Sequence, residues 1–336
     1  MAMKIAFFDV GEGEAEYLRE RLAGHEIAFF NDALDRDHLP ETLDFEAVSV
    51  LTSSRVDRDV IEALPKLAHI FARSTGYDHI DCEAARERGI AVCTVPGYGE
   101  HTVAEYAFAL LLAVSRKIYQ AYDRVRETGS FNLTGLCGSD LFGKTIGVVG
   151  TGRIGTQVIR IARGFGMEVI AHDASPRAEL EGELGFTYVS FSELLERADV
   201  ITLHVPSHSS TKHLINRDTI RGVKRGCILI NTARGDVVET EALVTALDEG
   251  ILAGVGLDVL EEEGVMREEV ELLAHGHPEE HNLRAVIANH ALIDMENAIV
   301  TPHNAFNTKE ALERILTETV ENIRACAEGK PRNAVS

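Results

Sequence analysis

The segment 143–173 constrains the fold of this chain more than any other stretch. It begins with a β-branched apolar run over 145–149 and continues with Gly150, Gly152 and Gly155 in the spacing G-x-G-x-x-G. An amphipathic helical pattern follows over 154–165, and a second apolar run ends at Asp173. A strand, a glycine-rich turn, a helix and an acidic strand end in this order are typical of the dinucleotide-binding unit of a parallel α/β sheet.

Each part of this unit has a physical role. The first glycine permits the tight turn, the second lets the backbone approach a pyrophosphate, and the third lets the helix pack close to the strand. The helix N-terminus can bind the phosphates. Asp173 can accept hydrogen bonds from both ribose hydroxyls and would repel a 2′-phosphate, which predicts NAD rather than NADP. A strand–helix turn without a ligand is the alternative, and the complete unit argues against it.

Length and charge narrow the class of protein. A chain of 336 residues exceeds one typical core and predicts two domains. The start of the chain lacks the pattern of a secretory signal, and no apolar run is long enough to span a membrane. The net charge of −21 argues against nucleic acids and anionic membranes as partners, and suits either a high-salt habitat or a highly soluble enzyme. Five scattered cysteines favour a reduced, cytoplasmic protein.

Strand-like and helix-like segments alternate along the chain, which predicts parallel α/β sheets. We expect strands over 3–8, 26–30, 47–51, 69–72, 90–93, 145–149, 167–171, 199–204, 227–231, 252–257 and 299–301. One long helix is predicted over 100–127, and it connects two domains that meet near residue 99. A last amphipathic helix is predicted over 308–327, followed by a loose tail after Gly329.

In open parallel sheets, ligands bind beyond the carboxyl ends of the strands. We therefore expect the residues that follow strand ends to line one edge of the sheet: Asp173, Pro206, Thr232, Ala233, Arg234, Asp258 and His303.

Three residue types near this edge suit acid–base chemistry on a carboxylic acid. The planar guanidinium of Arg234 suits bidentate binding of a carboxylate, although an arginine alone is more often a surface ion-pair partner. His303 is a natural proton carrier near neutral pH, although a lone histidine is often only a packing residue. A carboxylate beside it would favour the protonated imidazole. The pattern alone does not select among Glu261, Glu262 and Glu263.

These motifs together resemble the D-isomer-specific 2-hydroxyacid dehydrogenases, and within that family the D-lactate dehydrogenase group. The matching segments occur in the family's order: 74–81, 95–98, 150–155, 204–206, 232–235, 257–259 and 301–303. The resemblance implies an enzyme that reduces a 2-keto acid to a D-2-hydroxy acid with NADH, most simply pyruvate to D-lactate. The alternatives are a dehydrogenase for a bulkier 2-keto acid or for phosphoglycerate, and a protein of another class, an NAD(H)-sensing corepressor.

The resemblance also assigns roles to residues. The family's catalytic arginine, glutamate and histidine fall on Arg234, Glu263 and His303. Substrate contacts fall on Thr75, Gly76 and Tyr98, in addition to Arg234. Cofactor contacts fall on Gly150, Gly152, Arg153, Ile154, Gly155, Asp173, Val205, Pro206, Thr211, Thr232, Ala233 and Asp258.

The implied architecture has two doubly wound parallel-sheet domains. A Rossmann-type NAD-binding domain over 100–304 is inserted into a flavodoxin-like substrate domain made of 1–99 and 305–336, and a homodimer is implied. The chain departs from the family at Glu262 and Gly264, where prolines are frequent. Its long segment before His303 is rich in histidines, whose irregular spacing does not predict a metal site: His275, His277, His281 and His290.

Overall fold

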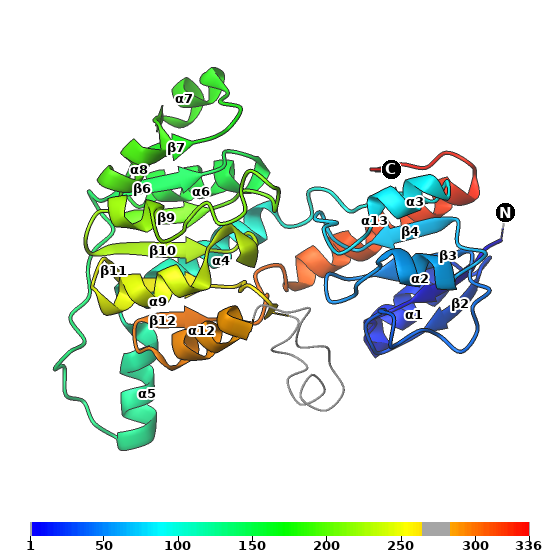
Figure 1. Ribbon diagram of the computed structural model, residues 1–336, viewed down its shortest axis with the longest axis horizontal. Helices are drawn as coiled ribbons and strands as arrows, with labels where there is room; N and C mark the ends of the chain where they lie inside the picture. Colours follow the sequence, from blue (N-terminus) through cyan, green and yellow to red (C-terminus); the bar gives the residue numbers. More distant parts are fainter. Residues whose placement is uncertain (1, 264–282, 336) are drawn as a thin grey trace. The chain divides into compact units, whose positions relative to one another are not determined.

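The computed structural model describes residues 2–263 and 283–335. The chain forms two compact units, each with its own parallel sheet (Figure 1). Unit 1 contains residues 1–98 and 307–336, and unit 2 contains residues 99–306. The predicted fold class, two parallel-sheet α/β domains with one inserted into the other, is confirmed.

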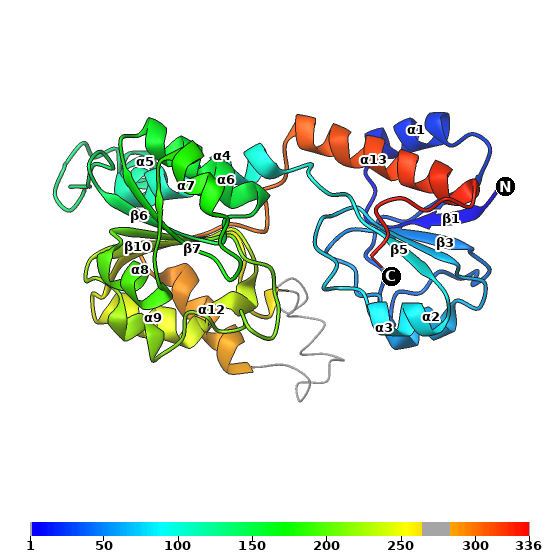
Figure 2. The ribbon, with the colours of Figure 1, turned by 90° about the horizontal axis from the view of Figure 1, so that it is seen from above.

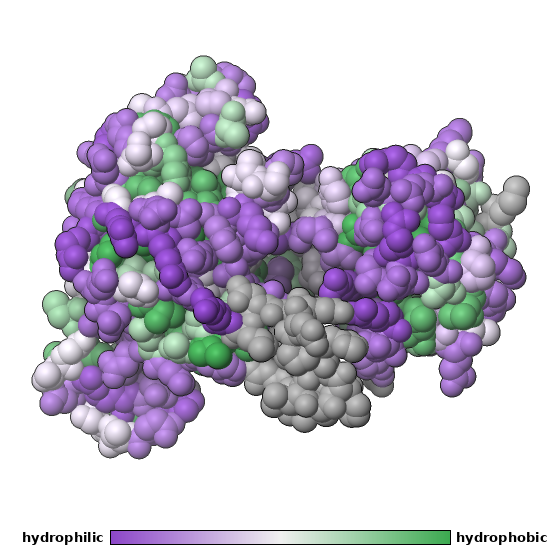
Figure 3. All heavy atoms as spheres, viewed as in Figure 1, coloured by the Kyte–Doolittle hydropathy of each residue, from purple (hydrophilic) through white to green (hydrophobic). Residues whose placement is uncertain are grey.

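Hydrophilic residues cover most of the face of each unit that Figure 3 shows, in keeping with the net charge of −21. Within the described ranges, no helix has the length and apolar character needed to cross a bilayer.

Unit 1 contains five parallel strands in the order β2-β1-β3-β4-β5. The strands are β1 (Lys4–Phe7), β2 (Glu26–Phe29), β3 (Ala47–Val50), β4 (His69–Ala72) and β5 (Ala91–Cys93). Helices α1 (Glu12–Arg21) and α13 (Lys309–Ala327) cover one face, and α2 (Arg58–Ala63) and α3 (Cys82–Glu87) cover the other (Figure 2). Alternate strand residues therefore enter two separate apolar clusters, one on each face of the sheet.

Unit 2 contains seven parallel strands in the order β12-β11-β10-β9-β6-β7-β8. The strands are β6 (Thr145–Val149), β7 (Glu168–His172), β8 (Thr187–Tyr188), β9 (Val200–Leu203), β10 (Cys227–Asn231), β11 (Leu252–Leu257) and β12 (Ala298–Val300). From β6 the chain first adds strands on one side and then, with β9, on the other. The boundary between β6 and β9 is thus the topological switch point, beside which ligands bind in such sheets.

Helices cover both faces of this sheet (Figure 2). One face packs against α4 (Glu100–Ser115), α6 (Arg153–Gly164) and α7 (Ala178–Leu184). The other packs against α8 (Phe191–Arg197), α9 (Thr240–Asp248) and α12 (Leu283–Asp294). The described part of the unit also contains helix α5 (Ile118–Thr128) and two short 3₁₀ helices, η1 (Thr219–Gly222) and η2 (Gly235–Val237).

The prediction of one continuous helix over 100–127 is wrong. Helix α4 ends at Ser115, and Lys117 adopts a left-handed conformation with φ of 50° before α5 begins. The Ser115 carbonyl accepts a hydrogen bond from Ser139 N–H at 2.9 Å, and a Cβ on Gly138 would overlap that carbonyl. The returning segment therefore takes the place that the next helical turn would occupy.

The prediction of a loose tail after Gly329 is also wrong. The Thr94 N–H donates to the Asn333 carbonyl at 3.0 Å, and the Val335 N–H donates to the Val92 carbonyl at 2.8 Å. The Asn333 side chain also donates to Glu318 at 2.7 Å. The tail therefore pairs with β5, one of the two edge strands of the unit 1 sheet, whose backbone groups would otherwise face water.

Candidate active site

The glycine turn of unit 2, residues 150–155, contains three glycines, of which two are closely packed and one borders open space. Gly150 follows β6 with φ of 92°, and a Cβ there would lie 2.6 Å from the His204 carbonyl oxygen. A Cβ on Gly155 would overlap the Gly150 carbonyl. A Cβ on Gly152, by contrast, would meet no described protein atom within 4 Å. Packing therefore requires the first and third glycines, whereas the second leaves room for a pyrophosphate at the N-terminus of α6.

Asp173 lies directly after β7 and is tied to this turn. Its Oδ2 accepts hydrogen bonds from the Thr151 N–H at 2.7 Å and from the Thr151 hydroxyl at 2.9 Å. Its Oδ1 accepts from Ser175 N–H at 2.8 Å. Burial opposes ionisation, but these hydrogen bonds outweigh it and hold the pKa of Asp173 below its usual range. An ionised carboxylate beside the glycine turn fits the adenosine ribose of NAD.

The other predicted cofactor residues surround the same strand ends. Val205 and Pro206 follow β9, and the Thr211 hydroxyl donates to the Pro206 carbonyl at 2.7 Å. Arg153 begins α6, and its largely exposed side chain forms an ion pair with Glu100 at 3.6 Å. Ile154 lies in the first turn of α6, and Thr232 and Ala233 follow β10.

The turn that carries Arg234 is fixed by the buried Asn231 at the end of β10. The Asn231 amide nitrogen donates to the Arg234 carbonyl at 2.9 Å, and its amide oxygen accepts from Ala233 N–H at 3.0 Å. A Cβ on the next residue, Gly235, would overlap the Leu260 carbonyl. The Arg234 turn therefore packs backbone to backbone against the acidic loop, residues 258–263.

Asp258 shapes the segment that presents His303. It is 1% exposed, and its carboxylate accepts hydrogen bonds from the Thr301 hydroxyl at 2.5 Å and from Asn304 and Ala305 N–H at 2.8 Å each. Burial raises the pKa of this carboxyl in spite of those bonds. The Asp258 carbonyl also accepts from His303 N–H at 2.9 Å. The carboxylate thus organises the protein loop, while its predicted contact with the cofactor stays a prediction.

The structure pairs His303 with Glu263 rather than with its two glutamate neighbours. His303 Nδ1 lies 2.8 Å from Glu263 Oε1, and the imidazole is 17% exposed. This contact leaves Nε2 as the ring nitrogen that can transfer a proton. Burial lowers the pKa of His204, the histidine that follows β9, to about 3, so His204 is neutral at ordinary assay pH.

Thr75, Gly76 and Tyr98 belong to unit 1. They lie after β4 and after β5, where the Thr75 hydroxyl donates to the Val95 carbonyl at 2.9 Å and the Ser74 hydroxyl to the Gly76 carbonyl at 2.6 Å. Arg314 Nε donates to the Tyr98 carbonyl at 2.8 Å. Their predicted contacts with the substrate stay a prediction.

The histidine-rich segment contributes no candidate metal site to the part of the chain that the structure describes, where no group of three suitable side chains could hold an ion. His275, His277 and His281 lie outside the described residues, and His290 lies on α12.

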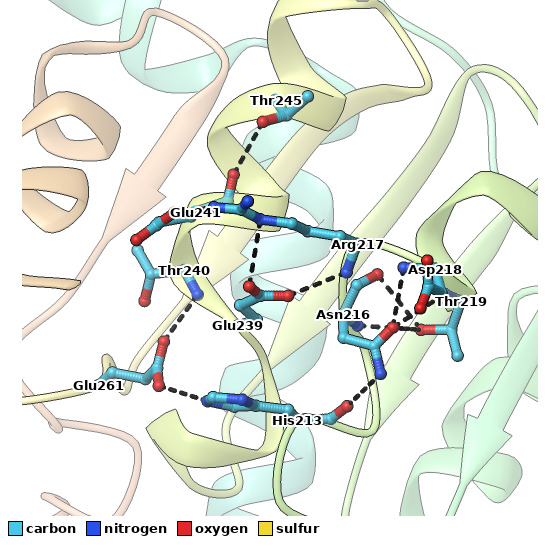
Figure 4. A network of polar contacts seen from close by, with 10 residues as sticks. All are labelled: His213, Asn216, Arg217, Asp218, Thr219, Glu239, Thr240, Glu241, Thr245 and Glu261. Atoms are coloured by element: carbon cyan, nitrogen blue, oxygen red, sulfur yellow. Dashed lines mark hydrogen bonds and ion pairs between the residues drawn. The ribbon is translucent and has the colours of Figure 1, made fainter. Parts of the chain in front are cut away.

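Sequence reasoning did not find a polar network beside the acidic loop (Figure 4). At one end of this network, Glu261 accepts hydrogen bonds from His213 and from the backbone of Thr240. His213 is a lone histidine far away in the sequence, and Glu261 is one of three adjacent glutamates, so neither carries a sequence signal.

Comparison with known proteins extends over nearly the whole chain. Residues 108–305 match the family described as D-isomer specific 2-hydroxyacid dehydrogenase, NAD binding domain. A glyoxylate reductase of Korarchaeum cryptofilum is 38% identical over 87% of this chain and 83% of its own. The D-lactate dehydrogenase of Escherichia coli is 33% identical over 98% of both chains. The crystal structure of D-lactate dehydrogenase from Aquifex aeolicus with NAD and lactic acid is 34% identical, covers 97% of this chain and 96% of its own, and superposes with a TM-score of 0.87.

Proposed function

Because the chain belongs to the family of D-isomer-specific 2-hydroxyacid dehydrogenases, which are NAD-dependent oxidoreductases, we propose that it reduces pyruvate to D-lactate. The observation that carries this proposal is the His303–Glu263 contact at 2.8 Å, in the unit that also holds the glycine turn and Arg234. The matches to D-lactate dehydrogenases over nearly the whole chain support the choice of pyruvate.

In this proposal each residue has one chemical task. NADH, when bound at the glycine turn, supplies the hydride for the keto carbon. Arg234 binds the substrate carboxylate through its planar guanidinium. His303 donates a proton from Nε2 to the carbonyl oxygen, where negative charge develops. Glu263 holds the ring in orientation and stabilises the protonated imidazole.

We also propose that the enzyme is a homodimer. Helix α5 presents a stripe of large apolar side chains, of which Ile118 is 53%, Tyr122 59% and Val125 42% exposed. These side chains line a groove that Leu112 and Arg116 extend. An apolar surface of this kind is typical of an interface, and a second copy of the chain is the partner that the family implies. All five cysteines are free, which supports a cytoplasmic location.

Steady-state assays with NADH and a panel of pyruvate, glyoxylate and larger 2-keto acids test the substrate. We expect the highest kcat/KM with pyruvate and a D-configured product. A preference for glyoxylate, the substrate named for the Korarchaeum relative, would reassign the substrate but not the chemistry. Tight NADH binding without turnover of any 2-keto acid would contradict the enzymatic proposal and favour an NAD(H)-sensing protein.

A further inference from the structure

The acidic loop that carries Glu263 is fixed by Glu261, two residues earlier. The Glu261 side chain is 11% exposed, against 38% for Glu263. Its Oε1 accepts a hydrogen bond from His213 Nε2 at 2.6 Å, and its Oε2 accepts from Thr240 N–H at 2.7 Å. Its carbonyl accepts from the side chain of the buried Asn289 at 2.6 Å. Three separate segments therefore fix this one residue.

His213 connects the acidic loop to the Arg234 turn, and Figure 4 shows its ring facing Glu261. Its backbone N–H donates to the carbonyl of Asp236, two residues after Arg234, at 2.7 Å. Its own carbonyl accepts from the Asn216 side chain at 2.9 Å. The backbone of His213 is held at φ of 50°, outside the usual region for a non-glycine residue. With both backbone groups bonded, the ring is directed at Glu261.

Three other charged side chains of the network are joined by ion pairs. Arg217 forms ion pairs with Glu239, at 3.2 Å, and with Glu241. Glu261, in contrast, faces His213 and the first N–H of α9, where the positive end of the helix dipole favours a carboxylate.

We propose that Glu261 and His213 are positioning residues, which hold the acidic loop against the Arg234 turn so that Glu263 meets His303. The inference rests on the proposed roles of Glu263 and His303. Only Glu262, itself left-handed with φ of 53°, separates the fixed Glu261 from Glu263. A shift of Glu261 would therefore move Glu263 relative to the imidazole.

The test compares Glu261→Gln, Glu263→Gln and, as a control of equal charge on the same loop, Glu262→Gln. A glutamine at 261 loses the charge that the N-terminus of α9 favours, and its NH₂ group can face His213 only if the imidazole changes from donor to acceptor, so the contacts that fix the loop are weakened. We expect kcat/KM for 2-keto acid reduction to fall 10- to 100-fold in Glu261→Gln, since small misplacements of catalytic groups have effects of this size. Binding of NADH should change less than twofold. Glu262→Gln should resemble the wild type.

Two further readouts separate positioning from general destabilisation. In both Glu261→Gln and Glu263→Gln, His303 should lose its proton at lower pH than in the wild type. NMR of protein with labelled histidines measures this titration, and the spectrum of His303→Gln identifies the His303 signal. Asp258 is the other carboxylate that is hydrogen-bonded to the segment of His303. It is present in every variant, so its effect on the His303 titration does not differ among them. His213→Gln keeps an N–H donor and should retain most activity, whereas His213→Leu should behave like Glu261→Gln. The losses of kcat/KM in His213→Leu and in Glu261→Gln should not add when the two substitutions are combined.

The proposal is overturned if Glu261→Gln matches Glu262→Gln in rate and in His303 titration while Glu263→Gln changes both. It is also overturned if Glu263→Gln leaves the His303 titration unchanged, since nothing would then need positioning. If the wild type reduces no 2-keto acid, the proposed function fails, but the NMR comparison still decides the positioning role.

Discussion

Asp173 should determine the choice of cofactor at the scale of a single residue. Its carboxylate is ionised and bonded to Thr151 in the glycine turn. Asp173→Ser removes the charge that would repel a 2′-phosphate and the acceptor for the ribose hydroxyls. We expect NADH affinity to fall about 10- to 100-fold, from the loss of hydrogen bonds to a charged group, and discrimination against NADPH to relax.

Fluorescence titrations with NADH and NADPH measure this effect, with the exposed Asp140→Ser as the control and a thermal melt to check folding. A wild-type enzyme that already prefers NADPH would contradict the ribose assignment. Arg177, whose side chain donates to the Thr151 carbonyl, would then be the residue to examine.

Arg234 should affect the substrate and not the cofactor. Arg234→Lys keeps the charge but loses the planar fork, so kcat/KM should fall about 10- to 100-fold while the Kd for NADH stays within twofold. Arg221→Lys, on an exposed part of η1, provides the matched control. Equal losses in kcat/KM and in NADH affinity would indicate that Arg234 mainly stabilises the backbone turn that carries it.

Glu263→Gln should shift the pH dependence of reduction. A glutamine keeps the shape of the side chain but removes the charge that favours the protonated imidazole of His303. Reduction needs that acid form, so the basic limb of the kcat/KM profile should move to lower pH. His303→Ala should lower the rate by roughly 10²–10⁴, the usual contribution of general acid catalysis. An unmoved basic limb in Glu263→Gln would argue against this pairing.

Single residues also show what the sequence could not supply. Three adjacent glutamates differ in burial and partners only once the chain is folded: Glu261 is enclosed by His213 and Thr240, and Glu263 faces His303. Only the resemblance to a family selected Glu263 beforehand. His213 could not have been found, because its partner lies on a loop that follows two further strands.

At the scale of elements, the close contact between η2 and the acidic loop gives a sharp prediction. Gly235→Ala places a Cβ on the Leu260 carbonyl, and backbone on both sides leaves little room to relax. Gly222→Ala, in the other 3₁₀ helix, meets no described atom within 4 Å. We expect Gly235→Ala to lower stability by about 1–3 kcal/mol and to reduce kcat/KM, and Gly222→Ala to do neither. Urea unfolding and steady-state kinetics of the pair measure both effects.

Helices and strands with strong apolar patterns were predictable from the sequence, whereas a break within a helical pattern was not. Strands β10 and β11 occupy the predicted residues, because short apolar runs between turn signals are typical of parallel strands with two buried faces. The break between α4 and α5 depends on a backbone contact to Ser139, which has no signature near Lys117. Helices α7 and α8 and the short edge strand β8 carry patterns too weak to predict an element there.

At the scale of the whole molecule, the apolar stripe on α5 predicts self-association. The wild type should sediment at twice the chain mass of 36.8 kDa. Replacing Ile118 and Val125 by glutamate puts two charges into the proposed interface and should yield monomers. Leu43→Glu, a similarly exposed apolar position in unit 1, should leave the dimer intact. A wild-type monomer at assay concentrations would contradict the proposal.

The division of the chain into a continuous unit 2 and a split unit 1 has a consequence for biosynthesis. One face of the unit 1 sheet, with Ile5 and Phe71, packs against Leu316 and Val320 of α13. Strands β1–β5 leave the ribosome first, whereas α13 and the tail that pairs with β5 leave last. At ordinary elongation rates, roughly 10–40 s pass between the synthesis of this apolar face and the synthesis of α13, which packs against it. Unit 2 can complete its fold in this interval, and we therefore expect the nascent N-terminal sheet to be open to aggregation and to chaperones until α13 is synthesised.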